Sequence, residues 1–447
     1  MSFLRTVYQQ LEAWKAQPTR KPLILRGARQ VGKTTLIRSF GRSYARYVEL
    51  NLERPEDRSW FERFNQPSEL MEALLLARGI PSKDRKRTLL FLDEIQAYPP
   101  AIGMLRYFHE ELPDLSVVSA GSLLEFAWNF VGSFPVGRVE FLYLHPLNFQ
   151  EYLQAHGMTL LLEALQEMPL RHTAHPVLLD AFHRYTLVGG MPEVVQAEVK
   201  GAGINDLQPI YRSLWSSYLS DTEKYAHSPT ELRVLRHVLQ AAPQHLDQRI
   251  TFQGFGNSNY RSREVGEAFR QLDDARFIRL IYPTTSTHFT APLDLDRKPR
   301  LQFLDTGLVH FARGGHSEVL GVPDFESSYR GALIPHIVTQ DLMSTLSGEK
   351  PRFWVRDKAQ SSAEVDLVIP HHGMLLPVEI KSGPTGRLRS LHEFMDRVDH
   401  SLAIRLHSGP MDVHEVQTRT GKKFTLLDLP YYLGSLLPLD YLVQKYG

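Results

Sequence analysis

A segment near the N-terminus, GARQVGKT at positions 27–34, has the residue types and spacing of a phosphate-binding loop. It lies between the strand-like run LILR and the helical run TTLIRSFGRSY, which is the setting that such a loop requires. Its glycines let the backbone curl so that successive N–H groups surround the β-phosphate of a nucleotide. Lys33 would reach the β- and γ-phosphates of ATP, and the Thr34 hydroxyl would ligate Mg²⁺. The predicted ATP-binding residues are Gly27, Ala28, Arg29, Gln30, Val31, Gly32, Lys33, Thr34 and Thr35.

Two acids, Asp93 and Glu94, follow the apolar run LLFL and end a second predicted strand. Because the carboxyl ends of parallel strands meet at one edge of a sheet, we expect both acids beside the phosphate-binding loop. Asp93 is predicted to hold the magnesium ion together with Thr34, and Glu94 to polarise the attacking water as the catalytic base. A base in this place indicates ATP hydrolysis rather than nucleotide binding alone. The alternative interpretation is a pair of solvated turn residues.

Four further residues are candidates to assist hydrolysis. Ser122 follows the run VVSAG, a strand that we expect between the loop strand and the acidic strand, so its hydroxyl could sense the γ-phosphate. Asn51 ends the run YVELN and is either a clamp that hydrogen-bonds Glu94 or a plain turn residue. Arg106 and Arg138 are candidates for an arginine finger, or else ordinary surface or salt-bridge residues.

A second charged group lies near the C-terminus, where Asp366 is followed by Glu379 and Lys381. Two carboxylates and a lysine at this D…ExK spacing, on neighbouring strands, can bind Mg²⁺ and stabilise an attacking hydroxide. The alternative is that Glu379 and Lys381 form an ion pair in a domain that serves only as a docking platform. The pair His371-His372 between the two strands is predicted to be a solvated turn, because adjacent residues of a strand point to opposite sides.

Alternating strands and helices must position these groups. Between Lys21 and about Gln154, the runs LILRG, YVELNL, LLFLDE, LSVVSAG and VEFLYL predict a parallel sheet with helices on both faces. Helical spacing continues to His227, with a turn at Gly189-Gly190-Met191-Pro192. Helices and then the runs FIRLIYP and LQFLD predict a winged helix. A further helix followed by FWVR, EVDLVIP, LLPVEIK and HSLAIRLH predicts a second α/β domain.

Several motifs together resemble a prokaryotic family of AAA-plus-related P-loop ATPases. They are GARQVGKT, LFLDEIQ, AGS, VGRVEFLYLHPLNFQEYL, LVGGMPE, FLDTGLV, and the pair EVDLVIP with VEIKSG. The resemblance covers nearly the whole chain and implies an ATPase core, a winged helix and a C-terminal PD-(D/E)xK restriction-endonuclease-like domain. In that family a glutamate of the preceding helix often completes the metal site. Here Pro335 takes its place, His336 is a poor Mg²⁺ ligand, and Asp341 lies too far along the helix to substitute.

The expected fold class is α/β with four domains. They are a P-loop AAA-plus-type core at 1–152, a helical region at 153–229, a winged-helix-like domain at 230–328 and a nuclease-like domain at 329–447. The length of 447 residues agrees with several domains. The absence of cysteine excludes disulfides, thiolate zinc sites and thiol nucleophiles. No run is long and apolar enough to span a membrane and no signal peptide is recognisable, so the expected location is the cytoplasm.

The expected partners are ATP, Mg²⁺ and DNA. The formal net charge of +1 shows no overall bias toward nucleic acid, so any DNA contact must be local. Arg261, Arg263 and Arg270, on the predicted second helix of the winged helix, could contact phosphates. The favoured function is an ATPase whose cycle moves the winged-helix and nuclease-like domains on DNA. The alternatives are a nucleotide-controlled protein-binding switch and an ATP-gated metal-dependent nuclease. The resemblance also makes a homo-oligomer, such as a hexameric ring, a candidate assembly.

Overall fold

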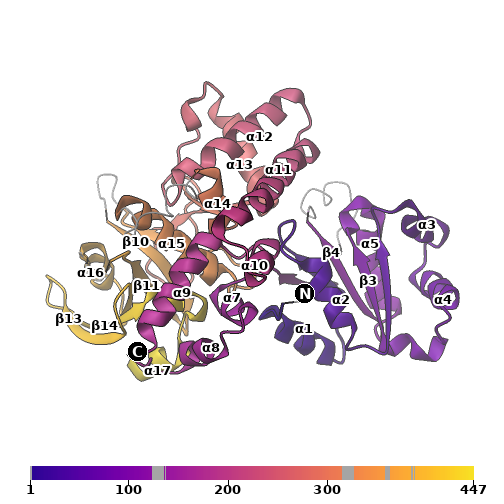
Figure 1. Cartoon of the computed structure of the whole chain (residues 1–447), viewed down its shortest axis with the longest axis horizontal. Coiled ribbons are helices and arrows are strands. Elements are labelled where there is room, and N and C mark those ends of the chain that lie inside the picture. Colours follow the sequence, from indigo (N-terminus) through magenta and orange to yellow (C-terminus); the bar gives the residue numbers. More distant parts are fainter. Residues whose placement is uncertain are drawn as a thin grey trace. The chain divides into compact units, whose positions relative to one another are not determined.

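The computed structural model describes residues 3–122, 135, 137–314, 327–357, 363–383, 386 and 388–446. The chain forms two compact units (Figure 1). The first comprises Met1–His145 with Asp274–Arg276, and the second comprises Pro146–Asp273 with Phe277–Gly447. The three domains predicted after residue 152 all fall within the second unit, apart from the three residues assigned to the first.

A five-stranded sheet in the order β2-β3-β4-β1-β5 forms the centre of the first unit, and every neighbouring pair in it is parallel. The strands are β1 (Leu23–Arg26), β2 (Arg46–Asn51), β3 (Thr88–Asp93), β4 (Ser116–Gly121) and β5 (Glu140–Tyr143). They coincide with the five apolar runs, so the predicted parallel sheet is confirmed. Because β4 lies between β1 and β3, the phosphate-binding loop, Ser122 and the two acids all follow strand ends at the same edge of the sheet.

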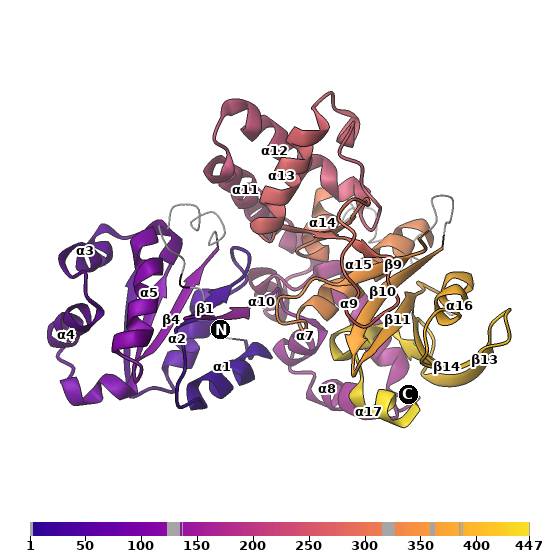
Figure 2. The ribbon, with the colours of Figure 1, turned by 180° about the vertical axis from the view of Figure 1, so that it is seen from behind.

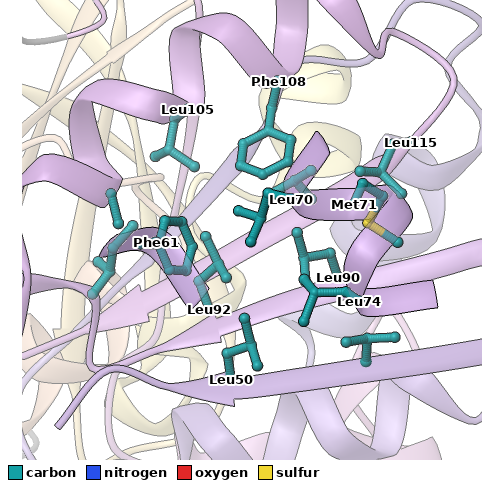
Figure 3. Close-up of a cluster of buried hydrophobic side chains, with 14 of the residues drawn as sticks. Leu50, Phe61, Leu70, Met71, Leu74, Leu90, Leu92, Leu105, Phe108 and Leu115 are labelled. Carbon is teal, nitrogen blue, oxygen red and sulfur yellow. The ribbon is translucent and has the colours of Figure 1, made fainter. Parts of the chain in front are cut away.

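Helices pack against both faces of this sheet. They are α1 (Val7–Ala16), α2 (Lys33–Gly41), α3 (Pro55–Arg63), α4 (Pro67–Ala77) and α5 (Pro99–Glu111), with the 3-10 turns η1 (Ser82–Arg87) and η2 (Ile95–Ala97). On one face Phe61, Leu74 and Phe108 pack with Leu50 and Leu90 (Figure 3). The alternate residues of β3 face the other side, where α2 contacts β3 and β4. Each buried side chain of this size contributes about 1.5–3 kcal/mol, so the core holds β3 and its terminal acids in place.

The second unit begins with helices, as predicted. They are α7 (Phe149–Ala155), α8 (Thr159–Gln166), α9 (His175–Val188), α10 (Pro192–Val199), α11 (Gln208–Tyr225), α12 (Pro229–Ala241) and α13 (Ser262–Asp274), with η4 (Ile204–Leu207), η5 (Ala242–His245) and η6 (Phe255–Asn257). The predicted turn separates α9 from α10. After α12 and α13 comes the antiparallel ribbon of β6 (Ile278–Ile281) and β8 (Arg300–Phe303), in the expected order. Among the helices that the structure describes, none has the length and apolar content needed to cross a membrane.

A seven-stranded mixed sheet, in the order β13-β14-β12-β11-β10-β9-β7, completes the second unit (Figure 2). Its strands are β7 (Pro283–Thr284), β9 (Arg352–Val355), β10 (Glu364–His371), β11 (Met374–Ile380), β12 (Leu402–His407), β13 (Asp412–Gln417) and β14 (Lys423–Pro430). The accompanying helices are α14 (Thr306–Ala312), α15 (Ser327–Met343), α16 (Arg389–Met395) and α17 (Asp440–Tyr446), with η8 (Tyr431–Leu436). The strands predicted for the second α/β domain coincide with β9 to β12. Leu367 of β10 pairs with Val378 of β11, so Asp366 and Glu379 lie one residue beyond this pair.

Two buried carboxylates join distant motifs inside the second unit. Asp305, in FLDTGLV, accepts a hydrogen bond of 2.6 Å from the backbone N–H of Gly190, in LVGGMPE. Asp341 of α15 accepts hydrogen bonds from the backbone N–H of Phe149 (3.1 Å) and the Tyr185 hydroxyl (2.8 Å). Burial raises the pKa of Asp305 to about 6 and that of Asp341 to about 7. Buried backbone amides need such partners, so these motifs are explained by packing within the unit.

Candidate functional site

The predicted phosphate-binding loop leaves β1 and enters α2 directly. A Cβ atom at Gly27 would lie 2.4 Å from the Leu144 carbonyl oxygen, so only glycine fits there. Gly32 has a φ of 97°, in the left-handed region that favours glycine. Lys33 and Thr34 then stand on the first turn of α2, whose free N–H groups favour anions. The nine predicted ATP-binding residues therefore form one continuous loop and helix start.

Lys33 is buried and directed at its own loop. Its ammonium group donates hydrogen bonds to the carbonyl oxygens of Gly27 (2.9 Å) and Ala28 (2.8 Å). Burial lowers the pKa of Lys33 to about 8, and the charges of Glu94 and Asp93 limit this shift. A phosphate oxygen would be a stronger acceptor than a neutral carbonyl, so an anionic ligand in the loop would favour the charged form of this lysine.

A hydrogen bond joins the loop to the acidic strand. Thr34 Oγ1 donates to Asp93 Oδ2 over 2.9 Å, and Asp93 Oδ1 accepts the backbone N–H of Glu94 over 3.1 Å. Burial raises the pKa of Asp93 to about 6, although both hydrogen bonds act in the opposite direction. A hydroxyl and a carboxylate oxygen are ligands that Mg²⁺ prefers, so the paired side chains fit the predicted metal position.

Glu94, the predicted base, follows β3 in a left-handed conformation with φ 49°. Its Oε2 accepts a hydrogen bond of 2.5 Å from Gln96 Nε2. Asn51 does not bond Glu94 in this structure, because its side-chain oxygen accepts the Glu53 N–H (2.9 Å) and its own N–H donates to Asp57 (2.9 Å). The turn alternative for Asn51 agrees with these contacts, and Gln96 is the partner of the predicted base.

Both arginine-finger candidates bind one carboxylate. The Nε atoms of Arg106 and Arg138 each lie 3.0 Å from Glu110 Oε1, and all three side chains are exposed. These contacts agree with the salt-bridge alternative, while a finger role across a subunit interface stays a prediction. Ser122 is half-buried and immediately follows β4, between the strands that carry the loop and the acids. Its role at the γ-phosphate also stays a prediction.

The three predicted C-terminal residues lie together on β10 and β11. Asp366 Oδ2 accepts the Ile380 N–H (2.8 Å), and Lys381 Nζ donates to Glu379 Oε1 (2.6 Å). The buried Glu379 Oε2 has no hydrogen-bond partner among the described residues. Burial, followed by the charge of Asp366, raises the pKa of Glu379 to about 7. The predicted ion pair between Glu379 and Lys381 is therefore present, next to a carboxylate that is partly protonated at neutral pH.

An arginine of β8 enters this carboxylate site. Arg300 Nη2 lies 3.2 Å from Asp366 Oδ1, the same guanidinium group forms an ion pair with Glu364, and Arg300 Nη1 lies 3.8 Å from Asp247 Oδ1. The guanidinium carbon stands 4.7 Å from the centre of the Phe353 ring. One largely buried arginine thus serves three carboxylates and supplies positive charge where a divalent cation would otherwise be needed.

The described side chains of α15 bring no further acid to Asp366 and Glu379. Pro335 is buried inside the helix. His336 accepts the Phe303 N–H at Nε2 over 3.0 Å, and burial lowers its pKa to about 3, so it is a neutral packing residue. The carboxylate of Asp341 is bonded to the α7 and α9 region described above. As predicted, neither His336 nor Asp341 takes the place of the missing glutamate.

The two histidines of the β10–β11 turn lie beside each other. The ring centroids of His371 and His372 are 4.1 Å apart, so the prediction that they point to opposite sides is wrong. His372 has φ 44° and Gly373 has φ 79°, and alternation of side chains holds only for an extended backbone. Asp440 Oδ1 lies 3.2 Å from His371 Nε2. The turn therefore gathers two imidazoles and a carboxylate.

The sequence analysis missed three residues that support these sites. Gln96 lies in the motif LFLDEIQ and was open to assignment, since it is two residues from the predicted base. Arg5 donates hydrogen bonds to the carbonyl oxygens of Val31 (3.0 Å) and His145 (2.5 Å), which ties the loop to the end of the first unit. Neither Arg5 nor Arg300 stands in a recognisable motif, because both act on residues far away in the sequence.

Family comparisons agree with the geometry of the first unit. Residues 19–153 match the model described as AAA domain, residues 179–319 match "Domain of unknown function (DUF8612)", and residues 330–430 match "Domain of unknown function (DUF4143)". A search of curated proteins found no match. The N-terminal part of the chain is therefore an AAA-type P-loop ATPase domain, and a second and third conserved region follow it.

Solved structures with a related arrangement include three ATPases or multidomain proteins at low identity. A Walker-type ATPase of Pyrococcus abyssi is 13% identical over 68% of this chain and 94% of that chain, with a TM-score of 0.43. A signal transduction ATPase with numerous domains and a tetratricopeptide repeat sensor, from Pyrococcus horikoshii, is 14% identical over 78% and 47%, with a TM-score of 0.28. C. elegans PCH-2 is 14% identical over 34% and 43%, with a TM-score of 0.21. Likeness at this level says nothing about substrate or partner.

Proposed function

We propose that the chain binds ATP with Mg²⁺ and hydrolyses it at the loop of residues 27–35, Asp93 and Glu94. The observation that carries this proposal is the 2.9 Å hydrogen bond between Thr34 Oγ1 and Asp93 Oδ2 at the N-terminus of α2. Thr34 and Asp93 would hold the metal ion, which when bound neutralises charge on the phosphates. The AAA family match over residues 19–153 supports the same assignment.

The other residues of the site have separate roles in this proposal. The loop N–H groups bind the β-phosphate, and Lys33 exchanges its loop carbonyl acceptors for phosphate oxygens. Glu94 accepts the proton of the attacking water, and the hydrogen bond from Gln96 fixes the position of its carboxylate. Ser122 contacts the γ-phosphate, and Arg106 or Arg138 leaves Glu110 to act as a finger in a neighbouring subunit. Comparing the mass of the protein with and without nucleotide tests the homo-oligomer that this last role requires.

Two substitutions separate ATP binding from hydrolysis. Lys33→Ala removes the side-chain cation at the loop and should abolish high-affinity ATP binding in a calorimetric titration. Glu94→Gln keeps the shape of the base and its hydrogen bonding, so it should bind ATP normally and stop turnover. Lys83→Ala, at an exposed position of η1, is the matched control and should change neither property. Unchanged affinity in Lys33→Ala, or normal hydrolysis in Glu94→Gln, would refute the assignment.

We further propose that the nucleotide cycle moves winged-helix-like and nuclease-like parts of the second unit on DNA. The order α12, α13, β6 and β8 supports the winged-helix assignment, and Arg261 and Arg263 are exposed at the start of α13. Arg270 pairs with Glu267 over 2.8 Å, which leaves it less free to bind phosphate. The double substitution Arg261→Ala and Arg263→Ala should weaken DNA binding and reduce its salt dependence by about one to two phosphate contacts. An ATPase rate indifferent to DNA would favour the protein-binding switch instead.

A second candidate function concerns the carboxylate site of β10 and β11, which we propose is a docking element rather than a nuclease centre. The ion pairs of Arg300 with Asp366 and Glu364 favour this candidate. A buried arginine that already neutralises these carboxylates competes directly with Mg²⁺, which relies on anionic oxygens for its affinity. The bond between Lys381 and Glu379 occupies a further oxygen.

A cleavage assay decides between docking and nuclease activity. Supercoiled and linear DNA are incubated with the purified protein in Mg²⁺ and separately in Mn²⁺, which binds such sites more tightly. We expect no efficient cleavage in Mg²⁺ and at most slow cleavage in Mn²⁺. Rapid Mg²⁺-dependent cutting that is abolished by both Asp366→Ala and Lys381→Ala would instead make the protein an ATP-coupled nuclease.

A further inference from the structure

The β10–β11 turn and the start of α17 bring together three groups outside the sites discussed so far. His371, His372 and Asp440 each offer one ligand atom, and these atoms all lie within 4.8 Å of one another. His371 and Asp440 are far apart in the sequence, so the fold of the second unit creates this group. Two imidazoles and one carboxylate are a donor set found at sites for zinc and neighbouring transition metals, whereas Mg²⁺ prefers oxygen ligands alone.

The geometry at His371 is that of an unused ligand atom. Its Nε2 is buried and makes no hydrogen bond among the described residues, although Asp440 Oδ1 is 3.2 Å away. Metal bonds of about 2.0–2.1 Å in a tetrahedral site place two ligand atoms about 3.3 Å apart, which is close to this separation. A metal ion between the two atoms would satisfy both without a change in the backbone.

The turn itself is shaped to present the second imidazole. His372 adopts φ 44°, a conformation that few residues other than glycine, asparagine and aspartate adopt without cost. This conformation places its ring beside that of His371, at 4.1 Å between centroids, instead of on the opposite face of the hairpin. His372 and Asp440 are exposed, so an ion can reach the group from solvent.

We propose that His371, His372 and Asp440 form a binding site for a divalent transition metal ion of the zinc class, with solvent completing the coordination. The ion bridges the tip of the β10–β11 hairpin and the first residue of α17. It is independent of the proposed Mg²⁺ at Thr34 and Asp93, which are oxygen ligands in the first unit. The site therefore acts as a metal staple that holds the C-terminal helix to the sheet.

Calorimetric titration of the tag-free full-length protein with Zn²⁺, in excess Mg²⁺ and without nucleotide, tests the proposal. Excess Mg²⁺ occupies oxygen sites, and we expect one equivalent of Zn²⁺ to bind in its presence. Both His372→Ala and Asp440→Asn change exposed residues, which protects against misfolding, and each should weaken this binding by about tenfold or more. His414→Ala is the matched control, since His414 Nε2 also lies near two carboxylates, at 3.5 Å from Asp412 and 3.1 Å from Asp428.

Hydrogen exchange gives a second, structural readout of the staple. Zn²⁺ should slow amide exchange in α17 of the wild-type protein and of His414→Ala, and should leave the exchange in Asp440→Asn unchanged. Zn²⁺ binding that survives both His372→Ala and Asp440→Asn would overturn the proposal. An equal loss of binding in His414→Ala would do the same, because it would show diffuse binding to surface histidines.

Discussion

The rate of ATP hydrolysis at low ATP concentration, kcat/KM, is expected to follow a bell-shaped pH profile with limbs near pH 6 and pH 8. This parameter reports the ionisation of the free enzyme, which is the state whose hydrogen bonds are described above. On the alkaline side Lys33, with its pKa lowered to about 8, loses the charge that attracts the phosphates. On the acid side Asp93, with its pKa raised to about 6, becomes protonated and can no longer serve as an anionic metal ligand.

The magnitude follows from these two pKa values. One pH unit above 8, only about one tenth of the Lys33 side chains are charged, so kcat/KM should fall about tenfold, or ~1.4 kcal/mol in apparent transition-state stabilisation. One unit below pH 6, about one tenth of Asp93 is ionised, and the same loss is expected. The signs are opposite because a lysine is active when protonated and an aspartate when deprotonated. The plateau should therefore lie between pH 6 and pH 8.

The assay measures steady-state hydrolysis from pH 5 to pH 9.5 at constant ionic strength and saturating Mg²⁺. Lys33→Arg serves as the control, because a guanidinium group stays charged over this range. Its rate is lower, but its alkaline limb should disappear. A flat wild-type profile between pH 7 and pH 9.5 would refute the burial argument for Lys33. An alkaline limb that persists in Lys33→Arg would assign that limb to another group.

Two further predictions concern single hydrogen bonds. Gln96→Ala removes the 2.5 Å bond to Glu94, and losing ~1.4 kcal/mol of positioning should lower kcat about tenfold with little change in KM; an unchanged kcat in steady-state kinetics would exclude this role. Asp305→Ala strands the backbone N–H groups of Gly190 and Leu308, which costs about 2–5 kcal/mol in the unfolding free energy of the second unit. Asp305→Asn keeps one acceptor and should lose about half as much in urea denaturation, while equal stability of all three proteins would contradict the packing role.

Much of the first unit could be predicted because its signals are local. Each strand is a short apolar run that ends in polar residues, and the loop glycines and Lys33 lie in one continuous segment. The parallel pairing then brought Asp93 to Thr34, as the spacing of the two motifs predicted. Gln96 was harder to assign, because its contact depends on the left-handed backbone at Glu94, which the sequence does not announce.

The second unit shows where sequence patterns lose their reach. Arg300 contacts Asp366 across 66 positions of sequence, and no periodicity links the two residues. The orientation of His371 and His372 was predicted from the alternation of an extended strand, but the turn is left-handed at His372. In both places the tertiary arrangement, rather than a local preference, decides which side chains meet.

The long-range bonds of Asp305 and Asp341 also set the order in which the chain can complete its fold during synthesis. The Gly190 amide waits for a carboxylate made 115 residues later, and the Phe149 amide waits for one made 192 residues later. At about 5–20 residues per second on the ribosome, the second delay lasts about 10–40 s. During that interval the ATPase domain can already be folded, while α7 and α9 emerge with their buried face uncovered. The nascent helices therefore depend on protection, by the ribosome surface or a chaperone, until α15 arrives to close the unit.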